Sequence, residues 1–488
     1  MCGAVACGDD DEPNNTPAQP DASLIDAGTD GATPPPPPPS DASTDTGVPG
    51  LDSGLPPTQP LTACPTHPNV RDQGQVCVIT GARGNEIKQS LSLAPVTGKM
   101  GYLLQDGVFV GEDVGGDAAP AAGKATVTLT IAPGTKLFGA SPLSFLLIQR
   151  GSKLEAAGTK EAPIVFTSAS ATPAPGQWGG LIINGRAPTN QGTNVAGEAE
   201  TGFYGGPDAA DNSGTLKYVR LEFTGGKVND TNELNGVAFQ GVGNGTTVDY
   251  VHVHASDDDA FEWFGGTVNA KHLVATAPGD DGLDWVAGYT GKIQYAIVQQ
   301  WTRVSSTDPT GIEADNLQTM PAATPISSPT LSNITLIGGA GVTNGRGANL
   351  RRGTGARLHS SVVTGFNTGG LVVTEPETIA QIGTTLAIKN SVFSNTTNYI
   401  LPSMATVNAA QQLGEFAGAA NQAVAVGTQL LTDPTSKTPN FKPQAGSALL
   451  TGGVTPAGDA FFANETFIGA VGADDWTAGW VTITPSSI

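Results

Sequence analysis

From about residue 125 onward, short stretches of alternating apolar and polar residues are separated by turns rich in Gly and Asn. Such alternation, with many Val, Ile, Thr and Tyr residues, predicts short β-strands. The two closest repeats are 22 and 23 residues apart, from 248 to 270 and from 270 to 293. The recurring strands fall at 216–222, 248–254, 270–275, 293–298, 331–336, 358–363 and 388–393. A second strand follows in most units, at 236–239, 260–263, 282–285, 311–314, 347–350 and 370–373.

A unit of about 22 residues with two or three short strands and no helix is typical of one coil of a parallel β-helix. The leucine-rich repeat has a similar length, but its Leu-x-x-Leu-x-Leu pattern is missing, and a propeller blade needs about 40 residues. Coils of a β-helix stack at about 4.8 Å, so equivalent residues form ladders. We expect two inward ladders, one formed by Val219, Val251 and Leu273, the other by Val237, Phe261, Leu283 and Ile312.

Composition and charge agree with an all-β protein and exclude some functions. Only 14% of the 488 residues are charged, and the chain contains 65 glycines. This composition disfavours a helical bundle. The net charge of −21 argues against nucleic acid as a partner, because phosphate backbones bind basic surfaces. No apolar run approaches the ~18 residues of a membrane-spanning helix.

The first 60 residues contain ten acidic residues and no Lys or Arg, with six consecutive prolines at 34–39. Such a segment buries too little apolar surface to offset its ordering entropy, so we expect a disordered, extended tether. The predicted organisation is a tether at 1–60, an N-terminal cap at 61–125, a β-helix at 126–465 and a C-terminal cap at 466–488.

The N-terminal residues suggest a membrane anchor. Residues 4–7 resemble a bacterial lipobox, in which small residues precede a cysteine that becomes lipidated, here Cys7. A signal peptide needs an apolar region of about 7–15 residues, so lipidation would require a start upstream of Met1. The alternative is a chance cysteine in a disordered tail. The lipobox interpretation predicts export to the bacterial outer membrane or cell surface, with the membrane as a partner through the lipid.

Two other cysteines, Cys64 and Cys77, bracket a short segment where the globular part begins. In an exported protein such a pair predicts a disulfide that pins the N-terminal cap. A metal site that includes His67 is the alternative, but it would lack a fourth ligand.

Six segments carry a family pattern, at 129–137, 158–168, 176–182, 257–271, 350–354 and 467–480. Together they resemble a group of secreted bacterial proteins with a right-handed, single-stranded parallel β-helix of the pectin-lyase-like fold. The group is known mostly as lipoproteins or cargo of type IX secretion, and the resemblance covers roughly residues 76–488. Its type IX members carry an added C-terminal sorting domain. This chain stops at Ile488, so we expect a lipid anchor instead.

Aligning the second strands places Glu262, Asp284, Glu313 and Asn349 at one coil position. Because side chains alternate along a strand and Phe261 is expected inside, these four should point outward. More acidic residues flank the same strands, so about nine carboxylates gather on one side of three adjacent coils. The candidate metal ligands are Asp258, Asp259, Glu262, Asp280, Asp281, Asp284, Glu313 and Asp315.

Carboxylates about 5 Å apart repel by about 3 kcal/mol per pair at an effective dielectric constant near 20. Bound Ca²⁺, which takes six to eight oxygen ligands in flexible geometry, would relieve this repulsion. Two alternatives remain. The acids could cap turns, or Glu262, Asp284 and Glu313 could be catalytic, with Arg351 and Arg352 binding a uronate or sulfate.

Other side chains offer further hypotheses. His252 and His254 could bind zinc with His272, but His272 aligns with Tyr250 instead, so a polar strand face is favoured. A sugar-stacking strip is one interpretation of four tryptophans, although for Trp263 and Trp285, which alternate with inward positions, a place in the core is favoured. The four tryptophans are Trp178, Trp263, Trp285 and Trp301. A short helix is expected within 409–421.

Two functions follow from these features. The first is a non-catalytic surface protein that binds polysaccharide or supports the envelope, with calcium as a stabiliser. The second is a polysaccharide lyase or glycoside hydrolase acting at the acidic flank. A carboxylate cluster closed by loops favours the first, whereas an open groove with basic residues facing the carboxylates favours the second.

Overall fold

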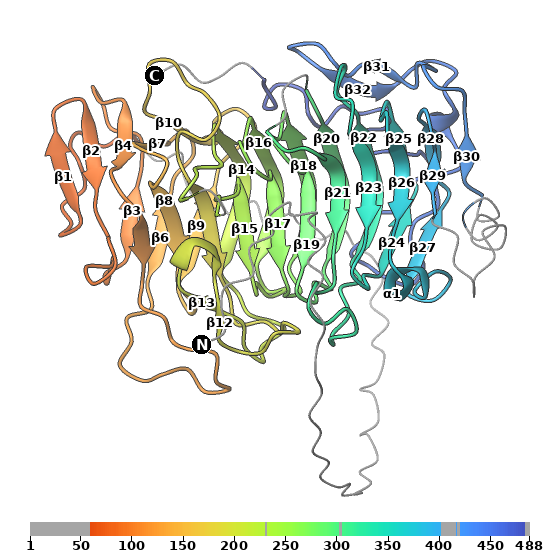
Figure 1. Ribbon diagram of the computed structural model, residues 1–488. Helices are drawn as coiled ribbons and strands as arrows, with labels where there is room; N and C mark the ends of the chain where they lie inside the picture. The colour runs from red at the N-terminus through yellow and green to blue at the C-terminus, as the bar shows by residue number, and fades with distance from the viewer. Residues whose placement is uncertain (1–58, 230–231, 302–304, 402–415, 417–419, 484–488) are drawn as a thin grey trace, which may run out of the picture. The chain divides into compact units, whose positions relative to one another are not determined.

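The computed structural model describes residues 59–229, 232–301, 305–401, 416 and 420–483 (Figure 1). The predicted tether, Cys7 and most of the helix expected at 409–421 lie outside these residues. Two sheets contain most of the described strands, and successive coils lie side by side in Figure 1, from orange to blue.

The first sheet has 18 strands among the described residues. They are β1 (Val70–Gln73), β2 (Val76–Ile79), β3 (Leu91–Leu93), β4 (Gly101–Leu104), β6 (Thr128–Ile131), β7 (Lys136–Gly139), β9 (Lys153–Ala157), β10 (Ile164–Ser168), β14 (Gly214–Glu222), β16 (Thr247–His254), β18 (Asn269–Thr276), β20 (Lys292–Gln299), β22 (Thr330–Ile337), β24 (Ala356–His359), β25 (Val362–Thr364), β27 (Leu386–Lys389), β28 (Val392–Ser394) and β30 (Gln422–Ala423).

The second sheet has 10 strands in the described part of the chain. They are β5 (Val108–Val110), β8 (Phe145–Ile148), β11 (Gly180–Asn184), β15 (Val237–Gln240), β17 (Phe261–Phe264), β19 (Leu283–Val286), β21 (Thr310–Ala314), β23 (Arg346–Leu350), β26 (Gly369–Val373) and β29 (Tyr399–Ile400). Outside the two sheets lie a hairpin of β12 (Val195–Ala196) and β13 (Phe203–Tyr204), a second hairpin of β31 (Leu431–Asp433) and β32 (Asn440–Pro443), and the helix α1 (Pro376–Ile379).

Parallel pairing in register confirms the predicted β-helix. In the 18-stranded sheet, Val219 pairs with Val251, and Val251 pairs with Leu273. In the 10-stranded sheet, the paired row runs through Val237, Phe261, Leu283 and Ile312. All of these side chains are buried in one continuous core between the sheets. The two inward ladders therefore lie where the alternation of apolar and polar residues placed them.

Each long strand of the 18-stranded sheet bends at one residue with a positive φ. In four consecutive coils these residues are Tyr218, Tyr250, His272 and Tyr295, with φ between 49° and 63°. A left-handed conformation costs an L-residue about 1 kcal/mol or more. Here the bend also stacks the rings on the outside of the coils. Ring centroids are 4.3 Å apart for Tyr218 and Tyr250, and 4.1 Å apart for Tyr250 and His272.

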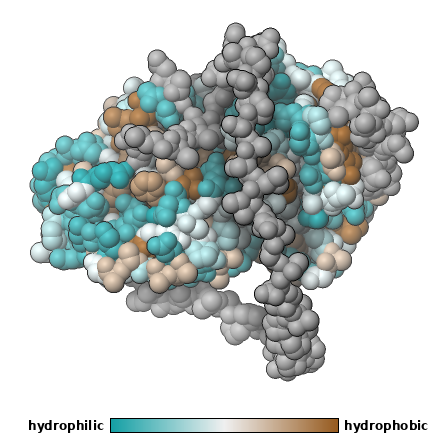
Figure 2. All heavy atoms as spheres, turned by 60° about the horizontal axis from the view of Figure 1, so that its bottom comes forward, coloured by the Kyte–Doolittle hydropathy of each residue, from teal (hydrophilic) through white to brown (hydrophobic). Residues whose placement is uncertain are grey.

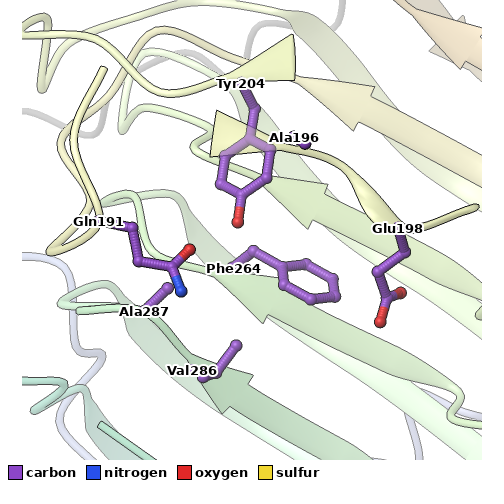
Figure 3. Close-up of a pocket in the computed structure, with 7 residues that line it drawn as sticks. All are labelled: Gln191, Ala196, Glu198, Tyr204, Phe264, Val286 and Ala287. Carbon is purple, nitrogen blue, oxygen red and sulfur yellow. The ribbon is translucent and has the colours of Figure 1, made fainter. Parts of the chain in front are cut away.

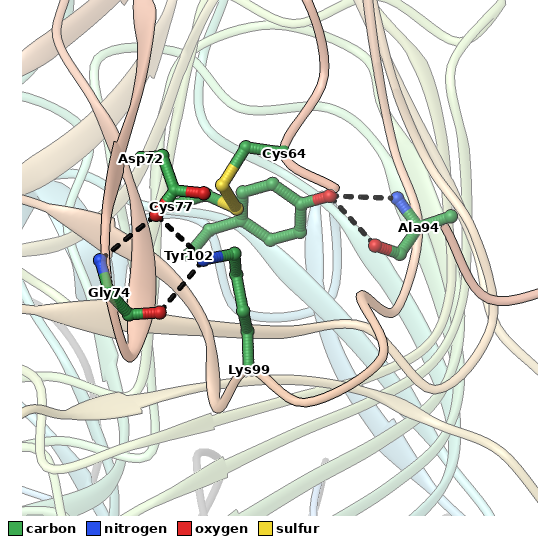
Figure 4. Close-up of a disulfide and its surroundings, with 7 residues drawn as sticks. All are labelled: Cys64, Asp72, Gly74, Cys77, Ala94, Lys99 and Tyr102. Atoms are coloured by element: carbon green, nitrogen blue, oxygen red, sulfur yellow. Dashed lines mark hydrogen bonds and ion pairs between the residues drawn. A yellow bond between two sulfur atoms is a disulfide. The ribbon is translucent and has the colours of Figure 1, made fainter. Parts of the chain in front are cut away.

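The predicted disulfide between Cys64 and Cys77 is confirmed, with an S–S distance of 2.06 Å (Figure 4). The ring of Tyr102 lies beside it, and the Tyr102 hydroxyl donates to the carbonyl oxygen of Ala94 at 2.7 Å. Cys77 belongs to β2, which pairs with β1 in an antiparallel and with β4 in a parallel arrangement. Parallel coils therefore begin near residue 76, earlier than the boundary expected at residue 126.

The C-terminal segment, defined here as residues 424–483, lies along the outer face of the 18-stranded sheet instead of only closing its end. The described part of the expected cap, 466–483, therefore belongs to a longer lateral cover, and residues 484–488 lie outside the described chain. The physical reason is an apolar row on that outer face, which needs a covering layer. The row consists of Val274, Ile297, Ile337, Val362 and Val392.

No helix in the described residues is long and apolar enough to cross a membrane. Figure 2 shows the molecule from the side that is at the bottom of Figure 1. The described part of this face is mostly hydrophilic or neutral, with small, separate hydrophobic areas (Figure 2).

Candidate metal site

The acidic ladder lies on the outer face of the 10-stranded sheet. Paired residues in register place Glu262 next to Asp284, Asp284 next to Glu313, and Glu313 next to Asn349, which confirms the aligned positions. Their neighbour Phe261 points into the core, so the carboxylates point away from it, as expected. They are nevertheless not exposed to solvent, because Glu262 and Asp284 are only 1% and 2% exposed.

Two of the flanking aspartates accept hydrogen bonds from the backbone of the next coil. The backbone N–H of Asp281 donates to Asp259 Oδ1 at 2.9 Å, and the N–H of Thr310 donates to Asp281 Oδ1 at 2.5 Å. These bonds span 22 and 29 residues of sequence, so they join neighbouring coils and differ from the local turn capping that was considered. Each of them uses a single oxygen, and a carboxylate has two oxygens with about four acceptor sites.

Three carboxylates from two adjacent coils converge. Asp259, Glu262 and Asp284 each place an oxygen within 4.8 Å of the others, and all three are buried. We call these three residues the buried trio. A second group, Asp258, Asp259 and Asp280, also places one oxygen of each residue within 4.8 Å of the others, and it lies nearer the surface.

Two oxygens of the buried trio accept no hydrogen bond from a donor in the described residues, although the carboxyl groups that carry them lie close enough to share a proton. They are Glu262 Oε1 and Asp284 Oδ1, both almost inaccessible to solvent. The other oxygen of Glu262 accepts a short hydrogen bond from Asn235 Nδ2. Buried polar atoms without a partner are rare in proteins and carry a free-energy penalty, so these two oxygens are candidate ligands for a cation.

Burial is the main reason why the pKa values of the clustered carboxyl groups rise. It raises the pKa of Glu262 well above its ordinary value, and the charges of Glu198 and Asp284 raise it further. Burial also raises the pKa of Asp284, with Glu313 as the largest added charge. Asp258, Asp259 and Asp281 shift in the same direction. Without a cation, the cluster therefore holds protons that it would release on binding one.

The far end of the ladder is neutralised by arginines, so it does not join the trio. Arg351 Nε donates to Asp315 Oδ1 at 3.0 Å and Arg351 also forms a short ion pair with Glu313. Arg352 Nη1 donates to the other oxygen of Asp315 at 2.7 Å. The expected ligand set thus divides into two parts, and neither metal-compatible group includes Glu313 or Asp315. Both arginines are engaged with carboxylates of the ladder.

The buried trio has no comparable counter-charge. Among the described residues, no salt bridge joins a Lys or Arg to Asp259, Glu262 or Asp284. Arg351 lowers the pKa of Asp284 only from a distance, and its effect is smaller than those of burial, Glu313 and Asp315.

A small cavity lies beneath the hairpin β12–β13, and its lining includes Glu198 and Phe264 (Figure 3). Tyr204 and Glu198 point from the hairpin segment toward the sheet that carries Phe264 and Val286 (Figure 3). The cavity has a volume of about 20 Å³, which is room for about one water molecule. It cannot hold a sugar residue.

Two residues near the trio were not predicted from the sequence. Asn235 lies two positions before β15, just as Asp259 lies two positions before β17, so the repeat alignment could have identified it. Glu198 lies in an insertion that lacks the repeat, and no sequence signal places it near Glu262.

The histidines do not form a metal site in the described residues, since neither metal-compatible group contains one. His272 stacks on Tyr250, as its alignment indicates. His252 and His254 both contact the hydroxyl of Thr276, at 2.9 Å and 2.8 Å. Trp263 and Trp285 are buried in the core, which confirms the favoured interpretation; Trp178 is also buried there, and Trp301 is partly exposed.

Comparison with known proteins identifies the domain. No curated protein and no solved structure matches the chain significantly. A family model described as a pectate-lyase-like beta helix domain matches residues 118–481, and this range includes the buried trio and the strands from β6 onward. The chain therefore belongs to the family of pectate-lyase-like β-helix domains.

Proposed function

We propose that this protein is a non-catalytic, exported β-helix in which a calcium ion bound by the buried trio stabilises the central coils. The observation that carries the proposal is the pair of buried oxygens, Glu262 Oε1 and Asp284 Oδ1, that accept no hydrogen bond from a donor in the described residues. They belong to adjacent strands, β17 and β19. A cation bound to both would replace the repulsion between these coils with a link between them.

Calcium suits the donor set better than other common ions. All candidate ligands are carboxylate oxygens, which favours hard cations such as Ca²⁺ and Mg²⁺ over zinc. Mg²⁺ demands near-ideal octahedral geometry and keeps several waters, whereas Ca²⁺ accepts irregular sets of six to eight oxygens. Carboxylates of a buried, irregular cluster therefore favour Ca²⁺.

Burial of the acids argues against a catalytic role for them. A polysaccharide would have to reach Glu262 and Asp284, which are 1% and 2% exposed. Arg351, the candidate for binding a uronate, is already paired with Glu313 and Asp315. Buried carboxylates that a polysaccharide cannot reach, beside an arginine already paired with other acids, fit a structural ion site better than a substrate site.

A surface location is part of the proposal. The disulfide between Cys64 and Cys77 is the kind of bond that persists in oxidising, extracytoplasmic compartments. We infer a lipid anchor at Cys7 that holds the β-helix at the outer membrane. Labelling of the natural precursor with a radioactive fatty acid, lost in Cys7→Ser, would test the anchor. An unlabelled wild-type protein would contradict it.

Thermal unfolding with and without calcium tests the ion site. We expect calcium to raise the melting temperature of the protein after treatment with EGTA, because the ion binds only the folded cluster. At a free concentration 1,000 times the dissociation constant, the gain is about 4 kcal/mol. Differential scanning calorimetry measures this shift, with Mg²⁺ as the comparison ion.

The exposed Asp433 offers a matched control. Asp433→Asn removes one carboxylate far from the trio in β31 and should leave the calcium shift unchanged. An equal melting temperature with calcium and with EGTA would contradict the ion site. Cleavage of a uronan or a neutral glycan that disappears in Asp284→Asn would contradict the non-catalytic role.

A further inference from the structure

One acidic side chain reaches the buried trio from outside the coils. Glu198 belongs to the hairpin segment that contains β12 and β13, and it is partly buried. Asn235 Nδ2 donates to Glu198 Oε2 at 3.3 Å and also to Glu262 Oε2. One amide group therefore holds both carboxylates, so Glu198 faces the side of the cluster that carries Glu262.

The hairpin is held at its base and also contacts the sheet along its length. Arg150 Nη1 donates to the carbonyl oxygens of Thr193 and Gly205, each at 2.9 Å, and these residues flank the hairpin. Each strand of the hairpin has only two residues, and such a short hairpin is unstable by itself in water. The position of its tip therefore depends on contacts with the sheet below.

Those contacts pack Tyr204 on Phe264, with ring centroids 6.1 Å apart, and the carbonyl oxygen of Thr201 accepts a hydrogen bond from Asn184 Nδ2 at 3.1 Å. A small cavity remains beside them, and its lining includes Ala196, Glu198 and Val286 (Figure 3). Because Glu198 and Glu262 accept from the same Asn235 Nδ2, their carboxylates lie close to each other. Where both are ionised and no cation is bound, they repel each other.

We propose that Glu198 is a further ligand of the cation, so that ion binding fastens the tip of the hairpin, residues 195–204, onto the 10-stranded sheet. This inference rests on the calcium site proposed above. A bound divalent ion would turn the repulsion between Glu198 and Glu262 into a shared attraction. When the ion leaves, this added link is lost, and the tip opens from the sheet more often.

Hydrogen exchange of the full chain tests the fastening directly. Amides of residues 195–204 should exchange at least about tenfold more slowly with calcium than with EGTA, because an ion-bound tip opens less often. Glu198→Gln keeps the size and the acceptor for Asn235 but loses the charge. In this variant the protection of the tip by calcium should disappear, and the affinity for calcium should fall by about tenfold.

The melting temperature separates failure of this inference from failure of the ion site. Glu198→Gln should still show a calcium-dependent rise in melting temperature, because the buried trio is intact. If calcium stabilises the wild type but leaves the exchange of 195–204 unchanged, or if Glu198→Gln behaves like the wild type, Glu198 is not a ligand. If calcium does not stabilise the wild type at all, the ion site itself is absent.

Glu155→Gln is the matched control for the loss of one negative charge. Glu155 lies on β9 of the 18-stranded sheet, away from the hairpin. This variant should retain the calcium-dependent protection of the hairpin. Equal loss of protection in Glu155→Gln and Glu198→Gln would mean that net charge, not ligation by Glu198, controls the tip.

Discussion

Glu262 and Asp284 are acids that the fold keeps out of water without giving them a basic partner. Each has one buried oxygen that accepts no hydrogen bond from a donor in the described residues. Burial raises the pKa of both groups, so protonation and ion binding compete for the same oxygens. This competition gives the site a pH dependence whose direction can be derived.

A folded-state pKa above the unfolded value of about 4 stabilises the ion-free protein at low pH. That contribution is complete below the unfolded pKa and is lost as the pH rises through the raised folded pKa. Calcium restores stability where the carboxylates are ionised. We therefore predict that the calcium-induced rise in melting temperature increases between pH 5 and pH 8, as measured by calorimetry at each pH with calcium and with EGTA.

Asp284→Asn should flatten this pH dependence. The amide mimics the protonated acid, so the ion-free variant should be more stable than the ion-free wild type at pH 8, by about 1–3 kcal/mol. Calcium should then stabilise the variant much less. The buried His254, whose pKa burial lowers to about 4, destabilises the protein at acid pH, but its effect is present with and without calcium. A calcium shift that stays constant with pH would contradict the role of the trio.

At the residue scale, strand alternation was enough to predict the row of Glu262, Asp284 and Glu313. It could not predict that Arg351 neutralises Glu313, because that contact depends on how the chain turns after β23. It also could not predict burial, since the covering residue Asn235 and the hairpin with Glu198 come from segments outside the aligned strands. A repeat pattern fixes which residues are neighbours along the solenoid, but not what covers them.

Among the elements, the C-terminal segment carries the largest unpredicted role. Its Trp480 is buried, with ring centroids 5.6 Å from Tyr218 and 5.9 Å from Tyr250, and its Nε1 donates to the carbonyl oxygen of Trp476 at 2.8 Å. It therefore covers the ring stack at the bends of the long strands. These rings would otherwise be exposed on the outside of the coils.

We predict that Trp480→Ala lowers the free energy of unfolding by about 3–5 kcal/mol, as expected for the loss of a buried tryptophan. Urea denaturation followed by tyrosine and tryptophan fluorescence would measure the change. Trp480→Phe keeps a ring but loses the indole N–H, so it should cost less. Met320→Ala, at an exposed position, should change stability by no more than about 0.5 kcal/mol. Similar losses in Trp480→Ala and Met320→Ala would contradict the covering role.

The strands of both sheets were predictable because a period of two and a recurring unit of about 22 residues are strong signals. The bends were not, because a positive φ is usual for Gly and uncommon for Tyr. Tyr218, Tyr250 and Tyr295 adopt it because parallel pairing on both sides of the bend fixes the strands, and stacking of the rings offsets part of the strain.

At the scale of the whole molecule, a solenoid is nearly one-dimensional, since each coil contacts mainly its neighbours. The disulfide between Cys64 and Cys77 closes a loop with a sequence separation of 13 at the first coil. Its stabilising effect should therefore remain local to the N-terminal end of the stack.

We predict that the double variant Cys64→Ser, Cys77→Ser loses about 3 kcal/mol, the value expected for a loop of this length. Hydrogen exchange should show faster opening at β1, β2 and β4, with little change at β17 and β19. Wild-type protein treated with a reductant should behave like the variant. Faster exchange spread evenly over all coils would contradict the local role of the disulfide.

The lateral position of the C-terminal segment has a consequence for biosynthesis. The cover over the apolar row that begins at Val274 is complete only when Trp480 has been synthesised, roughly 200 residues later. At 5–20 residues per second, this takes about 10–40 s. Throughout that time the newest coils present bare hydrophobic strips to whatever surrounds the nascent chain. Truncated chains that stop before residue 430 would keep these strips permanently, and they should bind chaperones or aggregate even though most of their coils are complete.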